Sequence, residues 1–311
     1  MRALFLFIVL LLLCAPLFGQ QNSDPDKVKF VTTDIDNFWR AYDLVQKESD
    51  RAAKIGIYQR EYIDKGSDGV KGFMDGRIQS AENLLDTIDA HKLYYASIRP
   101  TTLKIATYKA LMSKSFHRLK EIYPEAVFPD VYFVVGCLNS GTTSSNAIII
   151  GAEMNSRASA TPQGELSDWL KANLKSVEGV PYIVAHELIH IQQNYPEPKT
   201  LLGKSLEEGS ADFIGELISG RISNPVQKAY GEEHHAELWT EFQTAMNGTD
   251  LSRWLYNGSR SKDRPADLGY YIGYAISRAY YRQAGDKRKA IAEVLKLSDP
   301  ESLLRQSGYK G

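Results

Sequence analysis

The run His-Glu-Leu-Ile-His at 186–190 constrains this chain more than any other feature, because it places two histidines four residues apart. In a helix, such residues leave the same face one turn apart, so both imidazoles would point to one place. The flanking sequence favours a helix, since Pro181 suits a first turn and no proline or glycine follows before Pro196. Apolar residues recur on the opposite side, at Val180, Val184, Leu188 and Ile191. We expect one face to pack into a core while the other lines a cleft.

His186 and His190 have the residue type and spacing needed to bind one metal ion, and Glu187 lies beside them. The pattern is short, and two histidines in a buried helix can also merely satisfy hydrogen bonds. A catalytic zinc needs three protein ligands and one open position, so another segment must supply a ligand. If it does, Glu187 is placed to act as general base toward a water at the metal.

The segment Ser-Leu-Glu-Glu-Gly-Ser-Ala-Asp at 205–212 offers that third ligand. Glu208 and Asp212 are four residues apart, so one helical face would carry a ligand and a carboxylate that accepts the spare N–H of a ligating histidine. Two alternatives stay open, namely Glu207 as the ligand and a capping box between Ser205 and Glu208. We favour Glu208, because only Glu208 has an acidic partner four residues later.

Other zinc arrangements fit less well. A third histidine six positions after His190 is excluded, because Pro196 stands there, and the glycine of that arrangement is replaced by Gln193. His234, His235 and Glu237 form a second candidate metal site. We favour it less, because a charged helix such as this usually faces solvent. Two further histidines are expected to be structural: His91 and His117.

The apolar pattern divides the chain into helical and strand-rich parts. Residues 34–127 read as a helical lobe, in which Asp36 can cap a first helix and 103–122 form a later one that ends before Pro124. Two β-branched runs at 131–135 and 147–150, joined by a flexible turn, predict two strands. We predict an α+β fold, predominantly helical, in which a small sheet precedes the motif helix and a helical C-terminal part follows.

Length and pattern together predict one domain. Residues 34–311 would form it, with the sheet and the motif helix at 128–195 and the third ligand in the helical part at 196–311. Residues 20–33 are a polar, loose lead-in.

The N-terminal residues indicate export. Met1-Arg2, an apolar run from Ala3 to Leu13 and a small residue before a polar start predict a secretory signal peptide at 1–19. The apolar run is short for a bilayer span. The protein is therefore expected in the periplasm, in the cell envelope or outside the cell, with membrane attachment only if Cys14 is lipidated or the signal is retained. The net charge of −1 gives no reason to expect nucleic acid as a partner.

The combination HELIH and EEGSAD resembles the gluzincin metallopeptidases, in which HExxH and a downstream glutamate bind zinc. More narrowly, DIDNFW at 34–39 and GYYIGY at 269–274 resemble a family of proposed zinc-dependent proteases among exported bacterial proteins, some relatives of which are gliding-motility lipoproteins. The resemblance implies a zincin-like fold and one Zn²⁺ per chain. It also implies that His186, His190 and Glu208 are ligands, that Glu187 is the general base, and that Asp212 supports a histidine.

These inferences predict a zinc metallopeptidase that acts on a peptide or protein. A tyrosine in GYYIGY would stabilise the oxyanion; the candidates are Tyr270, Tyr271 and Tyr274, although aromatics at this spacing often only pack in a core. The strand at 147–151 would pair with an extended substrate. The main alternative is a non-catalytic binding or scaffold protein of the cell envelope with a structural or vestigial zinc site. A third option is a hydrolase that acts on another amide or ester.

Overall fold

The computed structural model describes residues 21–139, 141–144, 147–193, 199–222 and 224–311. The predicted signal peptide and Cys14 therefore lie outside the described residues. Within those residues, no helix combines the length and apolar character that a membrane span requires.

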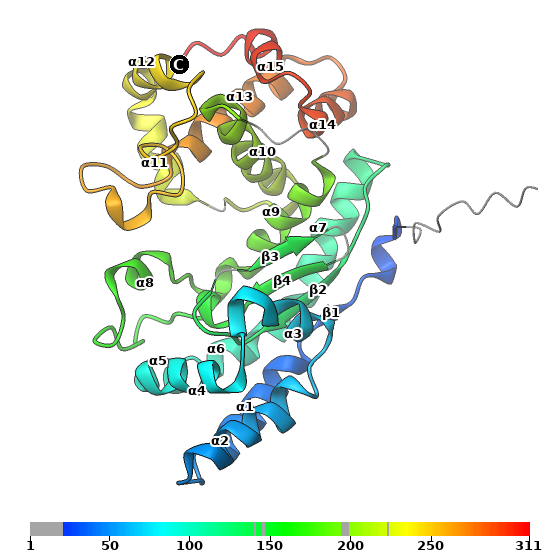
Figure 1. Cartoon of the computed structure of the whole chain (residues 1–311). Helices are drawn as coiled ribbons and strands as arrows, with labels where there is room; N and C mark the ends of the chain where they lie inside the picture. Colours follow the sequence, from blue (N-terminus) through cyan, green and yellow to red (C-terminus); the bar gives the residue numbers. More distant parts are fainter. Residues whose placement is uncertain (1–20, 140, 145–146, 194–198, 223) are drawn as a thin grey trace, which may run out of the picture.

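The described chain is mostly helical with one small sheet, so the predicted α+β class is confirmed (Figure 1). The helices before the second strand are α1 (Thr33–Val45), α2 (Arg51–Tyr58), α3 (Asp68–Phe73), α4 (Ala81–Ala90), α5 (Lys92–Ser97), α6 (Arg99–Lys104) and α7 (Lys109–Ile122). The later helices are α8 (Asp168–Asn173), α9 (Val180–Gln192), α10 (Leu201–Ser219), α11 (Pro225–Glu233), α12 (His235–Ala245), α13 (Leu268–Gln283), α14 (Lys287–Lys296) and α15 (Pro300–Ser307).

The sheet has four strands in the order β1-β2-β4-β3. The strands are β1 (Phe30–Val31), β2 (Asp130–Val134), β3 (Thr142–Ser144) and β4 (Ala147–Gly151). The two strands expected from the sequence are β2 and β4, which pair in parallel, and their connection contains β3, which is antiparallel to β4. Because β4 is paired on both sides, the expectation that it would receive an extended substrate is wrong. The free edge on the side of β4 belongs to β3.

Both faces of the sheet are covered. On one face α3 packs so closely that a Cβ at Gly69 would lie 2.4 Å from that of Tyr132, and one at Gly72 would lie 2.7 Å from Ile149 Cδ1. Ile150 points the other way and lines a cavity together with His186 of α9. This double coverage explains why residues 147–150 form an unbroken apolar run.

The N-terminal part departs from the sequence expectations in detail. Helix α1 begins at Thr33, so Asp36 lies inside the helix and does not cap it. The helix expected at 103–122 is interrupted by a 3-10 turn, Ile105–Tyr108, where the Thr107 hydroxyl donates to the Lys104 carbonyl. Its end at Ile122, before Pro124, is confirmed. The lead-in is more ordered than its polarity predicts, since it contains β1, which pairs with β2.

Helix α10 lies between α9 and α13 and contacts both (Figure 1). Two glycines make its crossing with α13 possible, because a Cβ at Gly209 would lie 2.1 Å from the Tyr274 backbone nitrogen. A Cβ at Gly273 would lie 1.7 Å from the Ser205 carbonyl oxygen. The two helix backbones therefore touch, and this contact fixes the position of α10 relative to the motif helix.

Candidate metal centre

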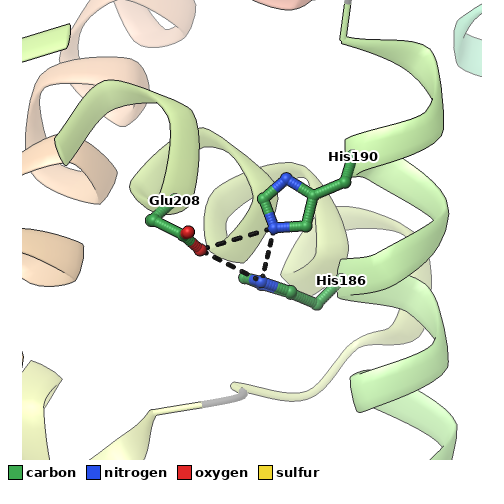
Figure 2. A group of neighbouring side chains, drawn as sticks. All are labelled: His186, His190 and Glu208. Atoms are coloured by element: carbon green, nitrogen blue, oxygen red, sulfur yellow. Dashed lines mark hydrogen bonds and ion pairs between the residues drawn. The ribbon is translucent and has the colours of Figure 1, made fainter. Parts of the chain in front are cut away.

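Three ligand atoms from α9 and α10 converge on one point (Figure 2). The Nε2 atoms of His186 and His190 are 2.9 Å apart. Glu208 Oε2 lies 3.6 Å from His186 Nε2 and 3.4 Å from His190 Nε2. The side chains of His186 and Glu208 are each 12% exposed, and that of His190 is 21% exposed. The group is therefore largely shielded from solvent but still accessible to a small ligand.

Helix α9 delivers the two histidines as its sequence predicted. Pro181 lies in the first turn, and the apolar residues Val180, Val184 and Leu188 are buried on the opposite side. Ile191 is only partly buried. The helical spacing therefore brings the two rings to 4.6 Å between centroids.

The outer nitrogen of each imidazole is held by a hydrogen-bond acceptor. His186 Nδ1 lies 2.8 Å from Asp212 Oδ1, and His190 Nδ1 lies 2.7 Å from Gln193 Oε1. The orientation of the Gln193 amide follows from its own donors, since Nε2 bonds the Glu207 carbonyl and the Ser210 hydroxyl. In the neutral imidazoles both Nδ1 atoms therefore carry the proton, and both Nε2 atoms would direct a lone pair at a cation bound between them and Glu208.

The electrostatics of the group favour positive charge between the three ligands. Burial alone would lower the pKa of His186, but the hydrogen bonds to Asp212 and Glu208 outweigh it and raise that pKa well above its usual value. Burial would raise the pKa of Glu208, but the two histidines outweigh it and hold that pKa well below the usual range. Such a group stabilises a bound cation.

The donor set fits zinc. Two imidazole nitrogens and one carboxylate oxygen are the ligands of many catalytic zinc sites, and tetrahedral coordination places ligand atoms about 3.3–3.5 Å apart. The distances to Glu208, 3.4 and 3.6 Å, lie within or close to this range, and the distance between the histidine nitrogens, 2.9 Å, is shorter. Among the residues that the structure describes, this is the only such group of His, Cys, Asp and Glu side chains.

Glu208 and not Glu207 reaches the histidines. Glu207 instead pairs with Lys204 at 2.9 Å. The capping-box alternative is wrong, because α10 begins at Leu201 and Thr200 caps it through a hydrogen bond to Gly203 N. Asp212 lies beside His186, in the place expected for a supporting carboxylate, and its second oxygen accepts a hydrogen bond from Asn224 at 2.7 Å.

Glu187 faces a cavity of about 500 Å³. His186 lines the same cavity, so the metal group has one side open to it. Thr143 of β3 donates its hydroxyl to Glu187 Oε2, which holds the carboxylate toward the edge strand. The cavity is within the range of size typical of small-ligand and peptide pockets.

The three tyrosines of GYYIGY lie in different places. Tyr270 lines the cavity, and its ring stacks at 6.3 Å from that of His186. Tyr271 covers Gly231 of α11, where a Cβ would lie 2.3 Å from the ring. The Tyr274 hydroxyl donates to Glu216 at 2.6 Å and accepts from Lys228 at 2.8 Å. Only Tyr270 therefore remains a candidate for contact with a ligand.

Sequence reasoning did not find Tyr256, whose hydroxyl donates to Glu208 Oε1 at 2.7 Å. Tyr256 also lines the cavity and has a positive φ of 53° in the loop before α13. No short motif marks a tyrosine in such a loop, because its place depends on how the loop folds back over α10. Asn224 was missed as a support of Asp212 for a similar reason, since it lies outside α10, and Gln193 was missed as a support of His190 although it follows that residue by only three positions.

The other histidines play no part in the centre. His234 pairs with Glu237 at 3.5 Å, and His235 contacts the Glu232 carbonyl. His91, directly after α4, and His117, within α7, each bond the carbonyl four residues earlier, as expected of structural residues.

Comparison with known proteins shows the family of the chain. The model of the family described as gliding motility protein GldB matches residues 20–311. No curated protein and no solved structure matches the chain. The expected likeness to gliding-motility lipoproteins is confirmed, whereas no comparison matches a gluzincin peptidase family.

Proposed function

Because the chain belongs to the family of the gliding motility protein GldB, we propose that it serves gliding motility in the cell envelope and holds one Zn²⁺ there. The convergence of His186, His190 and Glu208, with both outer histidine nitrogens held by acceptors, carries the metal assignment. We infer a lipoprotein of the cell envelope from this family, in which case Cys14 of the predicted leader would carry the lipid.

A second function, hydrolysis of peptide bonds, is favoured by one specific observation. The open side of the metal group and Glu187 face the same cavity of about 500 Å³, which a purely structural zinc site does not require. A zinc ion bound there would lower the pKa of water and polarise a carbonyl group.

In that reaction, side chains around the cavity would transfer the proton and stabilise the oxyanion. Glu187 accepts a proton at its carboxylate and then passes it to the leaving amine, while Thr143 keeps the carboxylate in place. Tyr270 lines the cavity and would donate its hydroxyl to a developing oxyanion, whereas the Tyr256 hydroxyl already donates to Glu208. The edge of β3 would bind an extended peptide as an added strand.

Metal analysis of the purified mature chain tests the zinc assignment. We expect one zinc per chain in the wild type, in Glu187→Gln and in the control His234→Ala, which lies outside the centre. His186→Ala should lose the metal, because two ligands do not suffice for a tight site. Zinc retained in His186→Ala at wild-type stoichiometry, or absent from the wild type, would overturn the assignment.

Restoring motility to a gliding strain that lacks the gene separates the two functions. If zinc serves binding or structure, the Glu187→Gln gene should restore gliding and the His186→Ala gene should not. If hydrolysis is the function, both variants should fail, and a peptide-library digest should be cleaved by the wild type but not by Glu187→Gln. Gliding restored by His186→Ala would contradict a role for the metal in motility.

A further inference from the structure

The cavity beside the metal centre has a second wall that the reaction above does not use. Helix α8 and the 3-10 segment Gly258–Arg260 contact each other there. A Cβ at Gly258 would lie 3.7 Å from the indole of Trp169. Both residues line the cavity, and so does Lys175, which follows α8 in the chain.

Lys175 is the only lysine or arginine among the described residues that line this cavity. Its backbone is fixed on both sides, since its N–H donates to the Met154 carbonyl at 2.8 Å and its carbonyl accepts from Arg157 N at 2.9 Å. Part of the residue is exposed to solvent, so a ligand can reach it, although the surrounding protein partly desolvates the ammonium group. No carboxylate of the described chain lies at ion-pair distance from its ammonium group.

The surroundings of Lys175 favour a negatively charged ligand. The protein around the ammonium group desolvates it and lowers its pKa, although Asp267 and Asp212 act in the opposite direction. Asp267 acts on the lysine only at longer range, and its carboxylate accepts the backbone N–H of Asn257 at 3.0 Å. A partly desolvated cation without a paired anion gains more from a ligand carboxylate than one in open water.

The cavity itself places Lys175 relative to the metal centre. Lys175, His186 and Glu187 all line it. A ligand carboxylate at Lys175 would therefore belong to a molecule that also reaches the open side of the metal group. Ile150, Met154 and the 44% exposed Trp169 give the same cavity an apolar surface for the rest of that molecule.

We propose that Lys175 is a specificity residue, which selects peptides that carry a carboxylate in the cavity next to the metal centre. The carboxylate comes from an aspartate or glutamate side chain, or from a free C-terminus. This selection rests on the proposed use of the cavity as a peptide site, and it holds whether the bound peptide is cleaved or only retained.

The test measures binding rather than turnover. The zinc-loaded mature chain with Glu187→Gln is titrated with dansyl-Ala-Ala-Glu-Ala-Ala-amide, with the matching Gln and Lys peptides, and with the Gln peptide that has a free C-terminus. We expect the Glu peptide or the free C-terminus to bind about three- to tenfold more tightly than the amidated Gln peptide. Comparison of these two peptides identifies the source of the carboxylate.

Variants of Lys175 decide whether this residue causes the selection. Lys175→Met should remove the preference, Lys175→Glu should reverse it in favour of the Lys peptide, and Lys175→Arg should retain it. Lys171→Met is the matched control, because Lys171 pairs with Asp168 and does not line the cavity. A merely structural role for Lys175 would not produce the reversal.

The peptide titrations separate a failure of the charge selection from a failure of the peptide site itself. Equal binding of all peptides overturns the selection by charge but leaves peptide binding intact. A preference for the Glu peptide that persists in Lys175→Met assigns the selection to another group and overturns the role of Lys175. If no peptide binds while zinc is present at one per chain, both the peptide site and the selection are wrong.

Discussion

Glu153 offers a test of the fold that holds the edge strand in place. Its side chain is fully buried directly after β4, and its Oε1 accepts the backbone N–H of Leu138 at 3.1 Å. Leu138 belongs to the loop that leads from β2 toward β3, and β3 contacts Glu187 through Thr143. Burial raises the pKa of Glu153 to about 7, and hydrogen bonds from backbone amides only partly offset this.

The size and sign of the effect follow from that pKa. The folded protein binds a proton that the unfolded chain, with a glutamate pKa of 4.5, has already released. The stabilisation is fully present below pH 4.5 and is lost as pH rises through 7. A change from 4.5 to about 7 corresponds to about 3 kcal/mol, at about 1.4 kcal/mol for each pH unit.

The change to make is Glu153→Gln, which keeps the shape of the side chain and removes the titration. Urea unfolding of the mature wild type and the variant is measured between about pH 4 and pH 8 with a chelator present, so that metal binding does not contribute. The stability of the wild type relative to Glu153→Gln should fall by about 3 kcal/mol over this range.

An exposed glutamate provides the control for this experiment. Glu233 is exposed on α11, so Glu233→Gln should run parallel to the wild type at every pH. If the curves of the wild type and Glu153→Gln are also parallel, Glu153 does not change its proton affinity on folding, and the reasoning from burial is wrong.

Three further predictions concern the metal centre and the packing of α10 against α13. Asp212→Asn should weaken zinc binding about 10- to 100-fold in a competition titration, because it changes the acceptor of the His186 N–H; unchanged affinity would contradict this support. Gly273→Ala should destabilise the protein by more than about 3 kcal/mol in urea, since its Cβ would lie 1.7 Å from the Ser205 carbonyl, and a variant of wild-type stability would refute the close crossing. Free zinc at 100 times its dissociation constant should raise the free energy of unfolding of the wild type by about 2.7 kcal/mol and leave that of His186→Ala unchanged. Urea unfolding with zinc and with a chelator measures this difference.

The sequence predicted the centre better than its surroundings, and the reason is distance along the chain. His186 and His190 share a helix, and Glu208 and Asp212 share another, so the 3.6-residue repeat alone orders each pair. Tyr256 reaches Glu208 from a loop that is 48 residues away in sequence. Nothing local in a sequence specifies such a contact, because it depends on the packing of α10 against α13.

The strands show the same limit. The β-branched runs identified β2 and β4, but their pairing is parallel and β3 is inserted between them in the chain. Residues 142–144 are too short a run to be recognised, and pairing direction depends on the path of the connection. The error over the substrate strand followed directly from not seeing β3.

The pattern Glu-Gly-x-Ala-Asp has a physical reason that bears on the question of function. Glu208 and Asp212 face the histidines, while Gly209 allows the backbone of α13 to approach α10. The ligand set is thus part of the packing of these helices, and an intact set alone does not show that the protein is an enzyme. Glu187 and Lys175 line the cavity without holding the helices together. Their variants therefore report on chemistry in the cavity while leaving the fold intact, which variants of Glu208 cannot do.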